Sequence, residues 1–169
     1  MSISKPLEEE YKALWEDIVE DSVTSYQEIK FRPTYRIGLT HHLRENQIYK
    51  FVNPQKTDVV LDIACASGRQ LFQLADKIKE GYGIDIAQKF IDKAEEYKTK
   101  YSTTNLHFKT GTIENISFDT DKFDKIICAE VLEHVFDKEI ALREVIRVLK
   151  PGGTLVISVP NLNADATLW

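Results

Sequence analysis

Residues 59–68 read Val-Val-Leu-Asp-Ile-Ala-Cys-Ala-Ser-Gly, an apolar run that meets a carboxylate and then a string of very small side chains. The run Val59–Ile63 is too short for a helix and too continuously apolar for a strand with one wet face, so it predicts a buried strand at the centre of a parallel sheet. The small residues after it leave room for a ligand beside the free N–H groups of a following helix. The stretch therefore predicts a ligand-binding loop at the carboxyl end of a strand, with a simple packed turn as the alternative.

Composition narrows the class of protein. The chain has 169 residues, of which 43% are hydrophobic, and a formal net charge of −5. Such a chain can bury one core, and its acidity argues against nonspecific nucleic-acid binding. Because it has neither a signal-peptide segment nor an apolar run of membrane-spanning length, we expect a soluble protein with no membrane partner. The two cysteines, Cys65 and Cys128, lack the spacing of a disulfide framework, which predicts reduced thiols and a cytoplasmic location.

Helices are expected before the opening stretch. Apolar spacing predicts an amphipathic helix over about residues 7–20, and a second helix is expected from an N-cap at Thr34 to Pro54. We expect a helical cap or lid over residues 1–54, packed on an α/β body over residues 55–169. Some aromatic and basic residues of the cap are candidates for lining a substrate pocket, with ordinary packing as the alternative. These candidates are Tyr26, Phe31, Arg32, Tyr35, Arg36, His41 and His42.

From residue 59 onward, strand and helix patterns alternate. The alternation predicts a doubly wound parallel sheet of about five strands with right-handed crossovers, which is a Rossmann-like α/β fold. A Pro-Gly-Gly turn at 151–153 is expected to end the last helix. Strands are expected at 59–63, 81–86, 106–108, 125–129 and 154–159, and helices near 69–78, 88–100 and 140–149.

A second carboxylate, Asp85, ends the second expected strand. A carboxylate at that position can accept two hydrogen bonds from a ribose diol, and an exposed strand-end aspartate is the alternative. A nicotinamide cofactor would favour a G-x-G-x-x-G sequence in the first turn, whereas this loop offers only Gly68. The pattern therefore favours a nucleotide-containing cofactor other than NAD and disfavours an oxidoreductase.

Four separated stretches occur in one order along the chain: 61–68, 83–86, 123–135 and 149–155. They resemble, in turn, the glycine-rich motif I, the acidic strand-two motif, the strand-four segment and the turn before strand five of class I S-adenosylmethionine-dependent methyltransferases, in particular the small-molecule type 11 branch. The resemblance implies an enzyme that uses S-adenosylmethionine, releases S-adenosylhomocysteine, and methylates an oxygen or nitrogen of a small-molecule acceptor.

The resemblance also implies roles for individual residues. The loop from Asp62 to Gly68 would cradle the methionine part of the cofactor, Asp85 would hold the ribose hydroxyls, and Ile86 would pack on the adenine. Thr112 stands where the family often has an aspartate, so a hydroxyl or backbone contact with the adenine is expected there. The other cofactor positions that the resemblance implies are Ala64, Cys65, Ala66, Ile113, Ala129 and Glu130.

Ala64 and Ala66 depart from the family, which has glycines at these places. If either position needs a positive φ, an alanine there costs about 1 kcal/mol and its methyl group crowds the ligand. Weaker but not abolished cofactor binding is expected.

Glu130 and His134 are the predicted catalytic residues, should the acceptor need a base. A structural hydrogen bond is the commoner role for a lone histidine. On one continuous helix, Glu130, Glu133 and His134 would share a face and could bind a divalent cation, as in the ubiquinone-pathway O-methyltransferases and small-RNA 2′-O-methyltransferases that this segment resembles. A metal is not the favoured interpretation.

The family's sheet usually has seven strands, whereas this sequence ends shortly after the fifth. Residues 154–159 would then form an exposed apolar edge, which proteins normally avoid. A truncated sequence is the favoured explanation, and a homodimer through this edge is the other. The same observation motivates an alternative function, a cofactor-binding or assembly module without turnover. The sequence does not identify the methyl acceptor.

Overall fold

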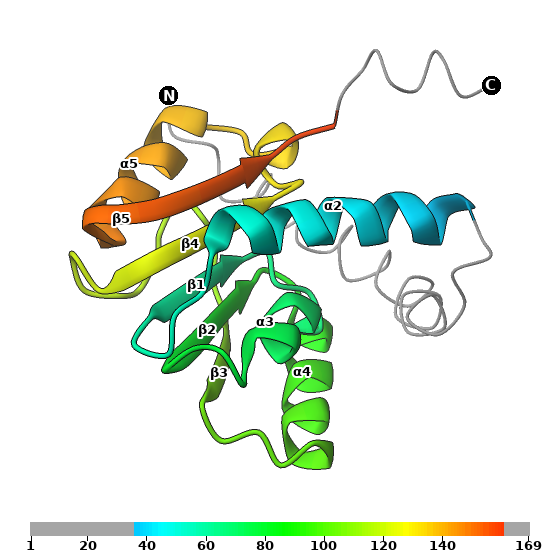
Figure 1. Ribbon diagram of the computed structural model, residues 1–169. Coiled ribbons are helices and arrows are strands. Elements are labelled where there is room, and N and C mark those ends of the chain that lie inside the picture. The colour runs from blue at the N-terminus through cyan, green and yellow to red at the C-terminus, as the bar shows by residue number, and fades with distance from the viewer. Residues whose placement is uncertain (1–35, 161–169) are drawn as a thin grey trace.

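The structure is a computed structural model that describes residues 36–160, with side chains from Arg44 onward. The helix expected over residues 7–20 and most of the pocket candidates of the cap lie outside the described residues. Figure 1 shows the elements, which are α2 (Arg36–Val52), β1 (Val59–Ile63), α3 (Arg69–Leu74), β2 (Glu80–Asp85), α4 (Gln88–Lys100), β3 (Leu106–Thr110), β4 (Phe123–Ala129), the 3-10 helix η1 (Leu132–His134), α5 (Lys138–Val148) and β5 (Leu149–Ser158).

The described strands form one parallel sheet in the order β3-β2-β1-β4-β5. β1 lies at its centre, and Val60 and Leu61 are completely buried, which confirms the position predicted for the opening stretch. The predicted Rossmann-like α/β fold is also confirmed. The strand order changes direction between β1 and β4, so the switch point of the sheet, where such folds bind ligands, lies between these two strands.

Helices cover both faces of the sheet, as its buried central strands require. On one face, α2 packs on β4 and β5, and α3 packs on β2, through residues that include Ile48, Val52 and Leu71. On the other face, Val145 and Val148 of α5 belong to a second apolar cluster. Figure 1 shows α2 lying along the strands, so this helix is packed onto the sheet.

Two element boundaries differ from the sequence-based expectation. α3 ends at Leu74 instead of near residue 78, because the chain turns there and Lys77 N donates to the Leu74 carbonyl at 2.7 Å. β5 begins at Leu149, before the Pro-Gly-Gly turn, because Leu149 already pairs with Phe123 of β4. The turn is therefore an irregularity within β5, where the register shifts, and does not precede the strand.

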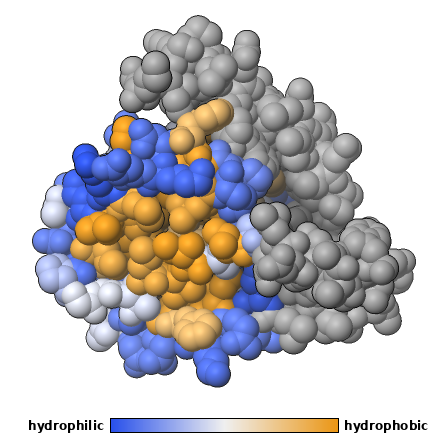
Figure 2. Space-filling model, turned by 90° about the horizontal axis from the view of Figure 1, so that it is seen from above, coloured by the Kyte–Doolittle hydropathy of each residue, from blue (hydrophilic) through white to orange (hydrophobic). Residues whose placement is uncertain are grey.

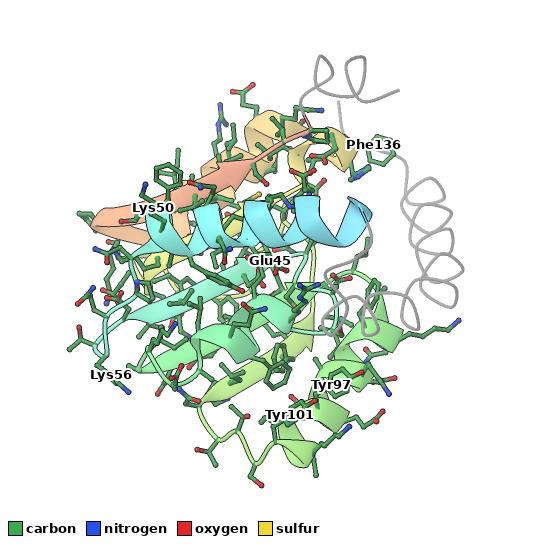
Figure 3. All side chains as sticks on the ribbon, turned by 45° about the vertical axis from the view of Figure 1, so that its right-hand side comes forward. Glu45, Lys50, Lys56, Tyr97, Tyr101 and Phe136 are labelled. Atoms are coloured by element: carbon green, nitrogen blue, oxygen red, sulfur yellow. The ribbon has the colours of Figure 1, made fainter. Side chains whose placement is uncertain are left out.

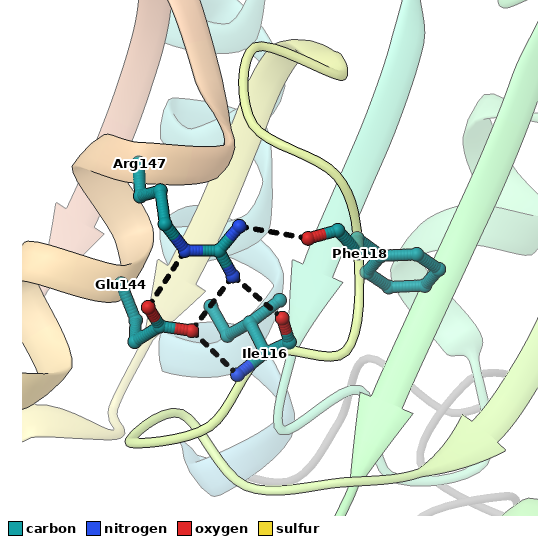
Figure 4. A network of polar contacts seen from close by, with 4 residues as sticks. All are labelled: Ile116, Phe118, Glu144 and Arg147. Carbon is teal, nitrogen blue, oxygen red and sulfur yellow. Dashed lines mark hydrogen bonds and ion pairs between the residues drawn. The ribbon is translucent and has the colours of Figure 1, made fainter.

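A polar network joins α5 to the connection between β3 and β4 (Figure 4). Arg147 donates from Nη2 to the Ile116 carbonyl and from Nη1 to the Phe118 carbonyl, each at 2.8 Å. Glu144 pairs with Arg147 and accepts from Ile116 N at 2.9 Å. These bonds satisfy backbone groups in a segment that has no helix of its own.

β5 is an edge strand of the described sheet, and large hydrophobic side chains gather beside it. Figure 2 looks down on the side where β5, α5 and α2 lie and shows a broad hydrophobic area. The exposed large hydrophobic residues on these three elements are Phe51, Ile140, Ile146 and Ile157. The expectation of an apolar edge at residues 154–159 thus agrees with the structure. Within residues 36–160, no helix has both the length and the apolar character that crossing a membrane requires.

Candidate functional site

The loop after β1 is attached to the end of β2. Cys65 N donates to the Ile84 carbonyl at 3.0 Å, and Ala66 N donates to Asp85 Oδ2 at 2.9 Å. Gly68 N closes the loop by donating to the Cys65 carbonyl at 2.9 Å. The loop after β1 and the acidic end of β2, which are two of the four stretches that resemble family motifs, therefore form one structural unit.

The loop backbone is strained at the two alanines. Ala64 and Ala66 have φ values of 55° and 46°, in the left-handed region that favours glycine. The positive φ that is expected to make an alanine costly is therefore present at both positions. Gly68 has a φ of 81°, and a Cβ there would lie 2.6 Å from the Phe108 ring, so glycine is required. Strain at two alanines of one loop is typical of a functional segment.

Asp85 lies where three loops meet. Its Oδ2 accepts from Ala66 N, its Oδ1 accepts from Ala87 N at 3.0 Å, and its carbonyl accepts from Gly111 N at 2.9 Å. These bonds connect the loops that follow β1, β2 and β3. Asp85 therefore orders the loops at this edge of the sheet, and its contact with a ribose diol stays a prediction.

Asp62 is buried in the core with only 1% of its surface exposed. Neither carboxylate oxygen has a hydrogen-bond partner within residues 36–160. Burial raises the pKa of Asp62 well above its usual value, and the charge of Asp85 raises this pKa further. A buried acceptor without a partner destabilises the fold. Its chemistry fits a ligand that brings a cationic or N–H group, such as the amino acid part of S-adenosylmethionine.

The remaining predicted cofactor residues lie at the same edge of the sheet. Ile86 follows β2, Ala129 ends β4, and Thr112 and Ile113 follow β3. Ile113 is buried, whereas the other three are partly accessible. Since all the strands are parallel, their carboxyl ends share one edge, and the structure brings the predicted cofactor positions together there.

Glu130, at the end of β4, already has partners. Its backbone lies in the left-handed region with φ 58°, and its N donates to the Ser158 carbonyl at 2.9 Å. One carboxylate oxygen accepts from Ser158 Oγ at 2.8 Å, and the other lies 3.1 Å from Arg44 Nη1. These contacts fix the side chain beside the switch point.

The expectation that Glu130, Glu133 and His134 share one helical face was wrong. Glu130 lies in a left-handed turn, residues 132–134 form a short 3-10 helix, and α5 begins only at Lys138. His134 is half exposed, and its Nε2 lies 3.9 Å from Glu133 Oε1. Across the described part of the chain, no three His, Cys, Asp or Glu side chains form a group that could hold a metal ion.

Both cysteines are free and buried. Burial raises the pKa of Cys65 well above its usual value and that of Cys128 to about 12. Neither thiol is therefore activated as a nucleophile.

The site contains charged residues that the sequence analysis did not identify. Glu45 of α2 accepts from Arg69, the first residue of α3, at 2.8 Å. A signal for this pair exists in the sequence, because Glu45, Ile48, Tyr49 and Val52 are spaced as one buried helical stripe. A carboxylate on such a stripe needs a partner.

Comparison with known proteins identifies the class. A family model described as a methyltransferase domain matches residues 54–168, and the chain belongs to this family. It is thus a member of the S-adenosylmethionine-dependent methyltransferases, which confirms the family and the cofactor expected from the four motifs.

Individual relatives agree with this assignment. The chain is 31% identical over 131 residues to a ubiquinone biosynthesis O-methyltransferase of Coxiella burnetii, with 76% of this chain and 56% of that protein covered. The solved structure of the Bacillus YcgJ protein matches with a TM-score of 0.67 and 29% identity, and the match covers 69% of this chain and 50% of that one. A Pyrococcus horikoshii protein, PH0226, matches with a TM-score of 0.65 and 28% identity, over 82% of this chain and 68% of that one. The chain spans about half the length of the first two relatives.

Proposed function

We propose that the protein transfers a methyl group from S-adenosylmethionine to an oxygen or nitrogen of a small-molecule acceptor. The single observation that carries this proposal is a convergence at the carboxyl end of the sheet. The strained loop 64–68 meets Asp85 there, beside Asp62, whose carboxylate has no hydrogen-bond partner among the described residues. The similarity to a protein named as an O-methyltransferase favours oxygen as the accepting atom.

In this proposal, the chain's own residues bind and orient the reactants. Asp62 and the loop 64–68 hold the amino acid part of the cofactor, and Asp85 holds the ribose diol. Ile86, Thr112 and Ile113 form the adenine end. When bound, S-adenosylmethionine supplies the methyl group on a sulfonium. Alignment of the acceptor with this group supplies much of the rate acceleration.

The two predicted catalytic residues, Glu130 and His134, have different roles in this proposal. The Glu130 carboxylate is engaged by Arg44 and Ser158, which favours a positioning role at the end of β4. His134 is accessible and remains the proposed base for an acceptor that must lose a proton. We further propose that the α2 region forms part of a cap over the site and that the protein is cytoplasmic.

The test is to incubate the chain with S-adenosylmethionine and a panel of phenols and amines and to measure S-adenosylhomocysteine by mass spectrometry. Product that appears only with an acceptor supports the proposal. Cofactor binding with no product, whichever acceptor is added, supports the second candidate, a binding module without turnover. The strained alanines of the loop favour this candidate. A folded chain that shows neither binding nor product contradicts both.

A further inference from the structure

Helix α2 places two adjacent charged side chains on opposite sides of the switch point. Glu45 pairs with Arg69, which directly follows the loop after β1, and Arg44 pairs with Glu130 at the end of β4. Figure 3 shows Glu45 on the side of α2 that faces the sheet. Because β1 and β4 are neighbours in the sheet, the two ion pairs attach one helix to both walls of the ligand crevice.

The Glu45–Arg69 pair is the more buried of the two. Its side chains are 9% and 17% exposed, whereas those of the Arg44–Glu130 pair are 31% and 25% exposed. The Glu139–Arg143 pair on α5 is an exposed pair for comparison, with side chains 76% and 75% exposed. Removing one partner from a buried pair leaves an uncompensated charge, which is far more costly than breaking an exposed pair.

The surroundings of this pair contain further polar atoms without partners. Arg69 Nε and Nη1 and the Tyr49 hydroxyl are buried and have no hydrogen-bond partner among the described residues. Tyr49 lies one helical turn after Glu45 on α2, and its pKa is raised by burial and then by the charge of Glu45. The pair therefore lies in a buried polar region of α2 and α3.

The strained loop needs support from more than one side. Left-handed alanines persist only where the surrounding structure determines their conformation. β2 holds one side of the loop through Asp85 and the Ile84 carbonyl. On the side of α3, the charged contact that follows the loop is that of Arg69 with Glu45.

We propose that Glu45 and Arg69 are positioning residues for the cofactor loop. Their ion pair fixes the start of α3 against α2, and it thereby holds residues 64–68 in the conformation that binds the cofactor. This inference rests on the proposed function. Cofactor affinity then depends on Glu45, a residue of α2 to which we assign no contact with the cofactor.

The test uses Glu45→Gln, which keeps the shape of the side chain and removes its charge. We expect calorimetry to show an affinity for S-adenosylhomocysteine at least about tenfold weaker than that of the parent chain, with the same stoichiometry. We also expect amide hydrogen exchange in residues 64–69 of the ligand-free variant to be faster. If Glu45→Gln does not fold, Arg69→Gln gives the same test, because it removes the other charge of the pair.

Two controls separate positioning from general destabilisation. Glu139→Gln breaks the exposed pair on α5 and should leave affinity and loop exchange unchanged. Val148→Ala lowers the melting temperature through the core on the opposite face of the sheet and should leave the affinity of the folded protein unchanged. An unchanged affinity or unchanged loop exchange in Glu45→Gln, or an affinity loss in Val148→Ala as large as that in Glu45→Gln, overturns the positioning role.

The two proposals fail in distinguishable ways. A folded parent chain that does not bind S-adenosylhomocysteine overturns the proposed function. In that case, the hydrogen-exchange comparison of the ligand-free proteins still decides whether the pair orders the loop.

Discussion

Asp62 is a residue at which ligand binding and stability oppose each other. Its carboxylate is buried without a partner in the described part of the chain, and its pKa is raised by burial and by Asp85. Desolvation of a carboxyl group without a compensating hydrogen bond destabilises the ligand-free fold. Stability is commonly sacrificed at functional sites, so this residue supports a ligand role at the end of β1.

The variant Asp62→Asn should change the pH dependence of stability. Because folding raises the pKa of Asp62, the folded chain keeps a proton that the unfolded chain has released. The contribution of this carboxyl group is therefore complete below its ordinary pKa of 3.8 and is lost as the pH rises toward the folded value. Urea unfolding between about pH 5 and pH 8 should show a decline in the parent that is smaller in the variant. Identical slopes would contradict the assignment of a raised pKa.

The strained alanines permit a second test at the residue scale. We expect Ala66→Gly to raise the free energy of unfolding by up to about 1 kcal/mol, because glycine adopts a positive φ without steric cost. The variant should also bind S-adenosylhomocysteine more tightly, since the methyl group no longer crowds the loop. Urea denaturation and calorimetry provide the two measurements.

Ala94→Gly is the matched control for Ala66→Gly. It makes the same chemical change at a buried position inside α4, where the backbone is helical, and should lower the free energy of unfolding by about 1 kcal/mol. Equal effects of the two substitutions would show that the backbone strain at Ala66 has no energetic consequence.

Sequence predicts some of these residues and not others for a physical reason. Asp62, Gly68 and Asp85 could be predicted because each lies at or just beyond the carboxyl-terminal part of a strand, and parallel strands place such positions at one edge. The partners of Glu130 and Arg69 could not be predicted, because they depend on where α2 and β5 lie in the tertiary structure. Only the position of Glu45 on an otherwise apolar stripe indicated such a contact.

At the scale of elements, α5 is held by its network with the β3–β4 connection. The hydrogen bond from Arg147 is the largest cause that lowers the pKa of Glu144 below its ordinary value. A lowered pKa means that this carboxylate stabilises the protein above the ordinary value of 4.5 and loses that effect as the pH falls through the folded value.

We expect Glu144→Gln to lower the free energy of unfolding by about 1–3 kcal/mol at neutral pH and by less at acidic pH. Chemical denaturation at a series of pH values measures both effects. Glu139→Gln, in the exposed pair, should change stability by no more than about 0.5 kcal/mol. A loss that is the same at acidic and neutral pH would rule out an ionic contribution from Glu144.

Sequence also predicts the type of an element better than its limits. Helix α4 was predicted with the bounds that the structure shows, because its apolar stripe and polar flanks agree. The segment after β4 was wrongly expected to be one helix, since its spacing is helical but the left-handed turn at Glu130 interrupts it. The hydrogen bond of that residue to β5 belongs to the tertiary structure and is not encoded in local spacing.

At the scale of the whole molecule, a broad hydrophobic area lies on the face that carries β5 (Figure 2). Among the described strands, β5 is paired only with β4, and an apolar edge of this kind favours association with another chain or segment. We expect the 169-residue chain to self-associate with rising concentration, and Ile157→Lys to weaken that association in analytical ultracentrifugation. Tyr101→Lys, which removes an exposed ring from the end of α4, should have little effect. Equal behaviour of the two variants would contradict a role for the β5 edge.

The central claim is that the edge formed by the loop after β1 and by Asp85 binds S-adenosylmethionine or its product. The most direct measurement is a calorimetric titration of S-adenosylhomocysteine into the parent chain and into Asp85→Ala, with folding of both verified by circular dichroism. We predict one site per chain in the parent and an affinity at least about tenfold lower in the variant, since the ribose contacts and the bond to Ala66 N are both lost. No binding by the folded parent, or equal affinities of the two proteins, would contradict the claim.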